Sequence, residues 1–211
     1  ADIAVDPIDG TTLTALGRPN ALSVIAVSDR GTMFDPGPCV YMEKIAVGPE
    51  AADVIDITQS ATENINRVAE VKGSKPGDIT VVVLDRPRHD DLVAEIRSTG
   101  ARIHSISDGD VAGAIATAWP TSSVDILFGI GGTPEGVISA AAMKCLRGAQ
   151  QGRLWPRNND ERAAAEAAGY DLSKVLTQDD MVRGDNCFFA ATGISDGELL
   201  DGVQFSPSGA K

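Results

Sequence analysis

The chain contains few aromatic residues and fewer basic than acidic ones. Aromatic side chains make up 4% of its 211 residues, so Val, Ile, Leu and Ala have to fill most of the hydrophobic core. Thirty acidic residues against 18 basic ones give a formal net charge of −12, which disfavours nucleic acids and anionic membranes as partners. An anionic ligand would therefore have to be attracted by a local site and not by the overall field.

Cysteine and histidine are also scarce. Cys39, Cys145 and Cys187 are far apart and form no CxxC pair, so we expect buried, reduced thiols in a reducing compartment, the cytoplasm. His89 and His104 are too few for a His-rich metal cluster. No apolar run approaches the ~20 residues needed to span a bilayer, and no signal peptide is recognisable.

The two ends of the sequence do not resemble domain boundaries. Ala1 stands inside the apolar run ADIAV, and the last residues, FSPSGAK, follow as a loop. Domain ends are ordinarily polar and flexible. We therefore expect a fragment that lacks the N-terminal region and the C-terminal end of a longer protein.

Residues 1–75 are predicted to form a sheet layer. Apolar runs at residues 1–5, 21–31 and 39–48 indicate strands, and the first strand ends at an aspartate motif. A helix is expected over residues 60–73, with a Ser or Thr cap and a closing glycine. The segment KGSKPGD that follows has the composition of a connector.

Residues 76–211 are predicted to form a second, α/β layer. Continuous apolar strands are expected at DITVVVLD, ARIHSIS and SVDILFGI, and each is followed by a loop and a helix. The β-α-β-α-β-α order favours a parallel sheet with helical crossovers. A polar, Ala-rich helix and the strand NCFFAATG follow. The predicted fold class is αβ: a layered α/β sandwich with an N-terminal sheet layer and a parallel-sheet layer.

The loops after the three middle strands carry most of the reactive side chains. Ligands of open parallel sheets bind beyond the carboxyl ends of the strands, so these loops should open on one edge. One loop contributes guanidinium groups, one carboxylates, and the third, GIGGTPEG, a glycine-rich helix start that lets a backbone approach phosphate without being a complete nucleotide-binding fingerprint. The candidate residues are Arg86, Arg88, Asp108, Asp110, Gly131, Gly132, Thr133 and Glu135.

The arginines have a functional and a structural interpretation. The guanidinium groups of Arg86 and Arg88 can bind phosphate through two parallel hydrogen bonds. They could equally form surface salt bridges with Asp90 or Asp91.

The acidic residues of these loops also have both a functional and a structural interpretation. Asp108 and Asp110 could accept hydrogen bonds from sugar hydroxyls, although an aspartate before a helix often caps it, and we expect capping for one of the two. Glu135 could simply be a favourable charge in the first turn of a helix, which contributes ~0.3–1 kcal/mol.

The stretch VDPIDGTTL places two aspartates three residues apart. Pro, Gly and Asp are common in turns, so the motif alone indicates a plain turn. Alternatively, Asp6 and Asp9 on one rigid loop can share a hard cation such as Mg²⁺, with the carbonyl of Ile8 as a third oxygen. Gly10 permits a tight backbone, and Thr11 offers a hydroxyl to phosphate or to water. Such a loop can position a metal, a phosphate and a nucleophilic water together.

The motif DPIDGTT resembles the D-P-(I/L)-D-G-T signature of the lithium-sensitive, metal-dependent phosphomonoesterases, a superfamily with inositol monophosphatases and fructose-1,6-bisphosphatases. Four further segments narrow the resemblance: YMEKIAVGP, LDRPRHD, ISDGDVAGAI and GIGGTPEGVISAAAMKC. In this order they resemble the class II fructose-1,6-bisphosphatases of bacteria, nearly collinearly over residues 1–211.

The resemblance implies a layered αβ sandwich that hydrolyses the 1-phosphate of fructose 1,6-bisphosphate in gluconeogenesis. It implies Mg²⁺ or Mn²⁺ as cofactor, a cytoplasmic location and usually a homo-oligomer. Asp6, Asp9 and Glu135 match metal ligands. Asp9, Gly10 and Thr11 match the phosphate-contacting loop, where Asp9 and Thr11 are the catalytic candidates and Thr11 orients the attacking water. The remaining substrate contacts, with arginines and tyrosine on phosphate and aspartates on the sugar, are Tyr41, Arg86, Arg88, Asp108, Asp110 and Gly132.

Some alternatives remain open. Family members carry further acidic metal ligands N-terminal to the region matched here, so we expect weak activity, or none, from these 211 residues alone. Sedoheptulose 1,7-bisphosphate, one carbon longer, is an alternative substrate. A non-catalytic phosphosugar- or nucleotide-binding module would keep the two arginines and GIGGTPEG without needing Asp6 and Asp9, and metal-dependent phosphate release would distinguish it from an enzyme.

Overall fold

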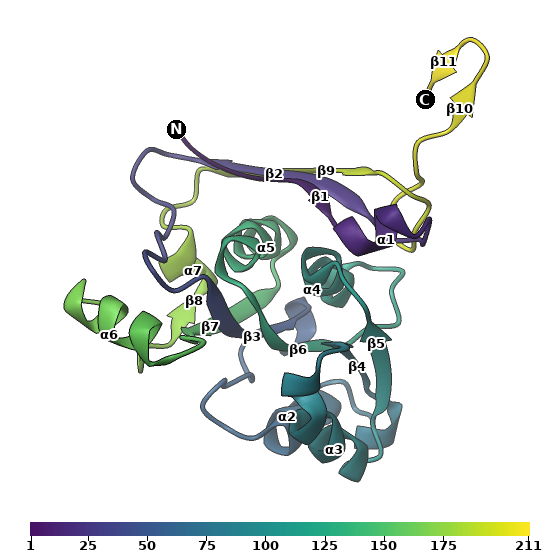
Figure 1. The fold of residues 1–211 in the computed structure, drawn as a ribbon. Helices are drawn as coiled ribbons and strands as arrows, with labels where there is room; N and C mark the ends of the chain where they lie inside the picture. Colours follow the sequence, from purple (N-terminus) through teal and green to yellow (C-terminus); the bar gives the residue numbers. More distant parts are fainter.

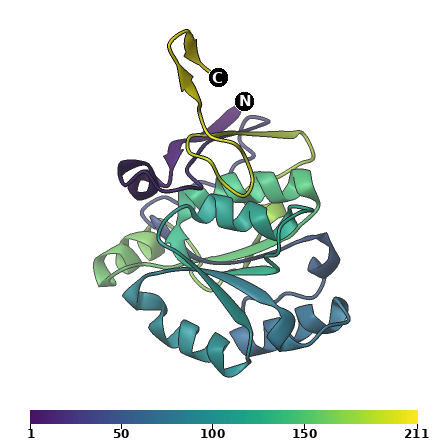
Figure 2. The same cartoon turned by 90° about the vertical axis from the view of Figure 1, so that its right-hand side faces the viewer.

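A computed structural model describes residues 1–211 as four stacked layers (Figure 1). A three-stranded sheet lies outermost, two helices lie beneath it, a six-stranded sheet follows, and a second pair of helices covers the far face of that sheet. The view turned by 90° in Figure 2 shows the same layers edge-on. The α/β sandwich expected from the alternating strand and helix patterns is therefore confirmed.

The three-stranded sheet is antiparallel, in the order β1 (Asp2–Asp9), β2 (Leu22–Ser28) and β9 (Cys187–Gly193). Burial alternates along β2, as the two-residue period of a strand dictates, so that one face packs on the helices below. The opposite face exposes apolar side chains, including Ile3 and Phe188 at 61% and 60%. The short helix α1 (Thr11–Ala15) follows β1 directly.

The six-stranded sheet is mixed. Its order is β5-β4-β6-β3-β7-β8, and only β4, β5 and β6 are mutually parallel, as the β-α-β-α-β-α pattern predicted. β3 is antiparallel to β6 and β7, and β8 is antiparallel to β7. The strands are β3 (Tyr41–Val47), β4 (Thr80–Leu84), β5 (Arg102–Ile106), β6 (Ile126–Gly132), β7 (Ala149–Leu154) and β8 (Leu176–Thr177).

Four helices cover the sheets. α4 (Asp110–Ala118) and α5 (Thr133–Leu146) lie between the two sheets, whereas α2 (Ala61–Val71) and α3 (Asp90–Ser98) cover the other face of the larger sheet (Figure 1). None of the helices combines the length and hydropathy needed to cross a membrane. The remaining elements are α6 (Asn159–Ala167), α7 (Gln178–Met181), β10 (Phe205–Ser206), β11 (Gly209–Ala210) and the 3₁₀ turns Pro49–Ala51, Pro76–Asp78 and Pro87–His89.

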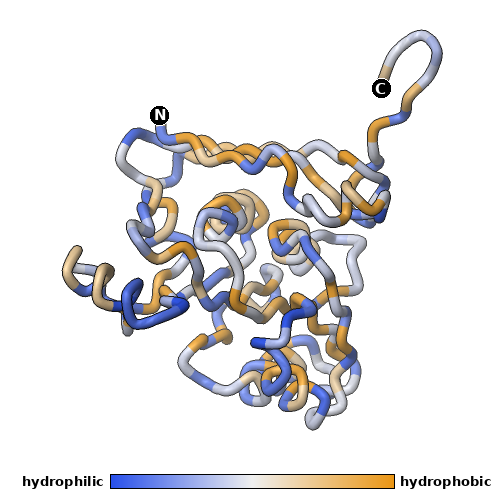
Figure 3. The backbone as a smooth tube through the Cα atoms, viewed as in Figure 1, coloured by the Kyte–Doolittle hydropathy of each residue, from blue (hydrophilic) through white to orange (hydrophobic).

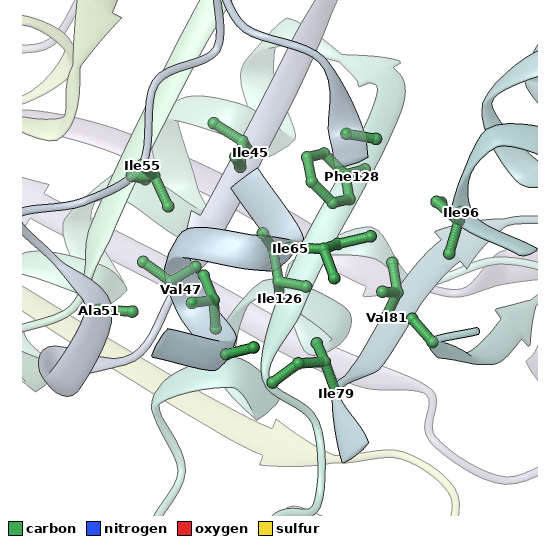
Figure 4. Packing of buried hydrophobic residues seen from close by; sticks show 14 of the residues in the cluster. Ile45, Val47, Ala51, Ile55, Ile65, Ile79, Val81, Ile96, Ile126 and Phe128 are labelled. Carbon is green, nitrogen blue, oxygen red and sulfur yellow. The ribbon is translucent and has the colours of Figure 1, made fainter. Parts of the chain in front are cut away.

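Apolar segments meet where the layers touch (Figure 3). Isoleucines of the larger sheet, such as Ile45 and Ile126, pack against Ile65 of α2 and Ile96 of α3 (Figure 4). A second cluster joins β2 to α4 and α5, and a third lies between those helices and the larger sheet. Each fully buried isoleucine contributes roughly 1.5–3 kcal/mol relative to an exposed one, so these contacts hold the layers in register.

The division of the chain at residue 75 does not match the two sheets. β3, expected in the first layer, is central in the larger sheet, and β9 returns from near the C-terminus to complete the smaller one. The physical reason is that strand pairing is a long-range property. Tyr41 pairs with Gly132, and Ser28 pairs with Cys187, which no local pattern can specify.

Several local expectations need correction. β1 continues through the aspartate motif to Asp9, and β6 runs directly into α5, so GIGGTPEG is not a loop. Strands β7 and β8 were not predicted, and the final residues form a small hairpin. Of the three cysteines, Cys39 is buried, but Cys145 is exposed and Cys187 is partly exposed.

Candidate active site

The carboxyl ends of β4, β5 and β6 meet at one edge of the larger sheet, as predicted from their parallel order. Because β3 runs the opposite way, its first residue joins this edge, and the end of β1 approaches from the smaller sheet. A cavity of about 320 Å³ lies between them. All site residues that the family resemblance implies line it: Asp6, Asp9, Gly10, Thr11, Tyr41, Arg86, Arg88, Asp108, Asp110, Gly132 and Glu135. Of the other two loop candidates, Gly131 lines the cavity, whereas Thr133 is buried and does not.

An irregularity in β1 brings its two aspartates to the same cavity. Asp6 pairs with Val24 and Asp9 with Leu22, so two residues of β1 lie opposite the single residue Ser23 of β2. In a regular strand, residues three apart point to opposite faces, and the extra residue of the bulge reverses that relationship. The motif is therefore the bulged end of a strand and not a plain turn.

Gly10 ends the strand in a left-handed conformation, with φ 91°. Only glycine adopts this conformation without strain, and a Cβ here would also press on Leu13 at 2.9 Å. The chain then turns into α1, which leaves Thr11 exposed at the cavity. The backbone N–H of Thr12 donates to Asp108 Oδ2 at 3.0 Å, so α1 is tied to the loop after β5.

Asp9 is a buried carboxylate at 3% exposure. Its Oδ2 accepts a hydrogen bond from the backbone N–H of Ala112 in α4 at 3.2 Å. Desolvation raises the pKa of Asp9 well above the usual range, the negative charge of Asp110 and that of Asp6 add to this rise, and the Ala112 hydrogen bond opposes it. Asp9 therefore carries an uncompensated cost when ionised, which a cation would relieve.

Glu135, in the first turn of α5, lies directly over the backbone of Gly132. A Cβ on Gly132 would displace the Glu135 carboxylate, so glycine at this position leaves room for that side chain. Glu135 Oε2 is buried and has no hydrogen-bond partner. Burial raises the pKa of Glu135, and the nearby carboxylates Asp110 and Asp6 raise it further. The carboxylate is thus more than a favourable charge at a helix start.

Lys44 is a site residue that sequence reasoning missed. It extends from β3, forms a hydrogen-bonded ion pair with Asp110 and donates to the carbonyl of Gly132 at 3.1 Å. The Lys44 side chain is buried at 4% exposure, and the Asp110 side chain is largely buried at 11%. A Cβ on Gly131 would collide with Asp110 Oδ2, which explains the second glycine. The available signal was a lone lysine that shares one strand face with the apolar residues Met42 and Ala46, both of which are buried.

Neither aspartate of the loop after β5 caps its own helix. The N-cap of α4 is Gly109, which has no side-chain cap hydrogen bond. Asp108 instead accepts from α1, and Asp110, in the first turn of α4, is paired with Lys44. The expectation of local capping is therefore wrong, because partners distant in the sequence compete successfully for both carboxylates.

The two arginines are held by backbone carbonyls. Arg86 donates to the carbonyls of Asp85 and Ser107, both at 2.8 Å, and lies 4.0 Å from Asp108 Oδ1. Arg88 donates through Nε and Nη2 to the carbonyl of Ile130, at 3.1 and 2.6 Å. The alternative salt bridges with the acidic residues at the start of α3 are not formed. Backbone anchoring leaves donors of both guanidinium groups for a ligand in the cavity.

Tyr41 is flanked by two guanidinium groups. The Cζ atom of Arg88 lies 5.3 Å from the ring centre and that of Arg157 lies 5.4 Å from it. Cation–π attraction favours this arrangement. Trp155 contacts the same ring edge-on, at a centroid distance of 6.5 Å. These contacts fix the orientation of Tyr41 at the cavity wall.

His89 anchors the arginine loop. It is buried; Nδ1 lies 2.7 Å from the Leu84 carbonyl and Nε2 accepts from the Ile130 N–H at 2.8 Å. These partners require a neutral ring that carries its proton on Nδ1. Burial lowers the pKa of His89, which favours that neutral form. His89 therefore connects the end of β4 to β6 and is no metal candidate.

The donor set fits a divalent cation in its chemistry. No three acidic, histidine or cysteine side chains converge closely enough to form a complete metal centre. Yet Asp6, Asp9 and Glu135 line one cavity, Glu135 has an unpartnered buried oxygen, and Asp9 is costly to ionise without a counter-charge. Carboxylate oxygens are the ligands that Mg²⁺ prefers.

Comparison with known proteins extends the resemblance. The family description "Bacterial fructose-1,6-bisphosphatase, glpX-encoded" matches residues 1–211. The chain is 45% identical over 215 residues to fructose-1,6-bisphosphatase 1 class 2 of Escherichia coli strain K12, and shows the same identity to the class 2 enzymes of E. coli O6:H1 and Shigella flexneri. Each alignment covers 96% of this chain and 64% of the relative, so the chain spans just under two thirds of the length of these relatives.

Proposed function

Because the chain belongs to the family of bacterial, glpX-encoded fructose-1,6-bisphosphatases, which are metal-dependent phosphatases, we propose that it forms the catalytic part of an enzyme that hydrolyses the 1-phosphate of fructose 1,6-bisphosphate to fructose 6-phosphate and phosphate. One observation carries this proposal: a single cavity joins two carboxylates of β1 and the Glu135 carboxylate of α5 to two backbone-anchored arginines. Carboxylates suit a cation and guanidinium groups suit phosphate.

We assign cation binding to Asp6, Asp9 and Glu135. The unpartnered Glu135 Oε2 and the raised pKa of Asp9 both support this role, since each group gains a favourable interaction when a cation is present. A bound Mg²⁺ or Mn²⁺ would offset charge on the phosphate and lower the pKa of a water molecule.

The remaining residues bind and orient the substrate in this proposal. Arg86, Arg88 and Tyr41 contact phosphate, and the fixed guanidinium positions favour bidentate recognition. Asp108 and Asp110 accept hydrogen bonds from sugar hydroxyls, and Gly132 allows close approach of the backbone.

The chemical step is assigned to the turn after β1. The hydroxyl of Thr11 orients the attacking water, and the buried carboxylate of Asp9 holds the neighbouring charge. Gly10 places its backbone against the phosphate, because the left-handed turn brings the chain round the cavity at that residue.

The test is phosphate release from fructose 1,6-bisphosphate by the full-length protein, titrated with Mg²⁺ and with Mn²⁺. Asp6→Asn should abolish metal-dependent hydrolysis and leave the fold intact, because it removes a ligand charge at an accessible position. Asp160→Asn, an exposed change in α6, is the matched control and should retain wild-type turnover. Wild-type turnover of Asp6→Asn at low Mg²⁺ would contradict the metal assignment.

Two alternatives give different results in the same assay. Comparable kcat/KM with sedoheptulose 1,7-bisphosphate would indicate a bifunctional enzyme, and binding of the bisphosphate without hydrolysis would favour a non-catalytic module. We further propose a cytoplasmic homo-oligomer. The three unbridged cysteines support a reducing compartment.

A further inference from the structure

Two cysteines distant in the sequence lie next to each other on the side of the layers away from the cavity. Cys145 stands in the last turn of α5, and Cys187 is the first residue of β9. Their sulfur atoms are 3.9 Å apart although 42 positions separate them in the chain. Neither residue takes part in the proposed phosphatase chemistry.

The pair is accessible, and the third cysteine is not. Cys145 is exposed and Cys187 is partly exposed, so an oxidant in solution can reach them. Cys39 is fully buried in a separate cluster with Leu154 and Ala165. Burial raises the pKa of Cys39, and desolvation and the neighbouring Cys187 raise the pKa of Cys145 as well, so access and proximity, not thiol acidity, set the pair apart. Cys39 therefore serves as an internal control.

We propose that Cys145 and Cys187 are a redox modification site that closes into a reversible intramolecular disulfide. The sulfur atoms have to approach from 3.9 Å to about 2.05 Å, which side-chain rotation at an exposed position can supply. The oxidant is a small-molecule disulfide. The thiolate of one cysteine of the pair attacks it and releases one small thiol, and the thiolate of the other cysteine then displaces the second.

The small disulfide accepts the two electrons that the protein thiols lose. Two protein thiols and one small disulfide give one protein disulfide and two small thiols, so the two electrons and both protons pass to the small molecule. In a reducing compartment the resting state is the dithiol, and the disulfide forms when the thiol pool becomes oxidised. Excess small thiol reverses the reaction.

The bond would connect the two layers that supply the cavity. α5 begins at Thr133 and carries Glu135 next to the cavity, whereas β9 pairs with β2, which pairs with β1 and its aspartates. A covalent link between α5 and β9 closes a 42-residue separation and restricts the unfolded chain. We expect the oxidised protein to show a Tm raised by roughly 5–15 °C.

The experiment exposes the native protein to glutathione disulfide as the probe. Free thiols are then counted under denaturing conditions, the intact mass is measured, and peptides are mapped by mass spectrometry. The wild-type protein should lose two thiols and two hydrogen atoms of mass, and retain the Cys39 thiol. Cys39→Ser should lose both of its thiols, whereas Cys145→Ser and Cys187→Ser should form no internal disulfide.

Thermal unfolding provides the second readout. Oxidation should raise the Tm of wild type and of Cys39→Ser, and excess dithiothreitol should return it to the starting value; Cys145→Ser should show no increase. Retention of all three thiols would overturn the proposal. So would a bridge to Cys39, a disulfide between two copies of the chain, or a stable glutathione adduct in place of an internal bond.

Discussion

Lys44 and Asp110 form a buried ion pair that joins the centre of the larger sheet to the first turn of α4. The same ammonium group donates to the carbonyl of Gly132, at the end of β6. One cation thus fixes the relative positions of β3, β6 and α4 at the cavity. It also offsets part of the negative charge of Asp9 and Glu135.

Replacing Lys44 by Met should destabilise the protein by about 3–5 kcal/mol, because it leaves the Asp110 carboxylate buried and unpaired. Urea unfolding measures this change. Lys174→Met, which removes the exposed partner of Asp180, is the control and should cost no more than about 1 kcal/mol. The combined Lys44→Met, Asp110→Leu variant should recover much of the lost stability while phosphatase activity stays low. A loss below about 1 kcal/mol for Lys44→Met would show that the pair does not organise the site.

Asp9→Asn should stabilise the metal-free protein at neutral pH and abolish activity. Burial and Asp110 raise the pKa of Asp9 in the folded state above its reference value of 3.8. The contribution of the protonated group is fully present below pH 3.8 and is lost as the pH rises through the folded pKa. The neutral amide of Asn does not ionise, so the variant keeps this stabilising contribution at neutral pH. Its side-chain oxygen can still accept a hydrogen bond from the Ala112 N–H.

The corresponding measurement is Tm against pH in EDTA for wild type and Asp9→Asn. The Tm of Asp9→Asn should be higher than that of wild type at pH 7, and this difference in Tm should decrease as the pH falls. Saturating Mg²⁺ should narrow the difference by stabilising wild type alone. A lower Tm of the variant at pH 7 would contradict the prediction, because it would mean that the ionised Asp9 carboxylate stabilises the metal-free protein.

Thr11→Ala should lower kcat with little change in KM. Its hydroxyl stands at the cavity one residue past the left-handed turn at Gly10, where it can orient the attacking water. Removing one positioned proton-handling group typically costs ~10²–10⁴-fold in rate. Thr11→Ser keeps the hydroxyl and should retain much of the activity. Steady-state kinetics of both variants test whether the Thr11 hydroxyl orients the water. Equal kcat values for Thr11→Ala and Thr11→Ser would contradict this role.

Arg88→Ala should raise KM for the bisphosphate more than it lowers kcat, provided its contact with the non-reacting phosphate is equal in the ground and transition states. The side chain already donates through Nε and Nη2 to Ile130, so its position does not depend on substrate. Arg88→Lys keeps the positive charge but not the planar guanidinium group, so its KM should lie between those of wild type and Arg88→Ala. An unchanged KM for Arg88→Ala would remove this residue from the phosphate site.

Much of the local structure could be predicted because it depends on neighbours in the chain. The helix after Ser60 begins where the hydroxyl of that residue accepts from Glu63, and the run VVVL is buried on both faces as its composition requires. The candidate site residues could be found for a related reason. Most of them stand at or just beyond the carboxyl end of a strand, and three of those strands are parallel. Tyr41, the first residue of β3, was identified only through the family resemblance.

The sequence by itself determined the alternation of strands and helices from β4 to α5, the chemistry of the loops after those strands and the candidate residues that line the cavity. Only the tertiary structure decided that β3 and β9 exchange layers, that Lys44 is the partner of Asp110, and that Cys145 meets Cys187. The physical reason is the range of the interactions. Strand period, capping and turn conformation act over a few residues. The pairings of β3 and β9, the Lys44–Asp110 ion pair and the cysteine contact instead join positions 42 to 171 residues apart.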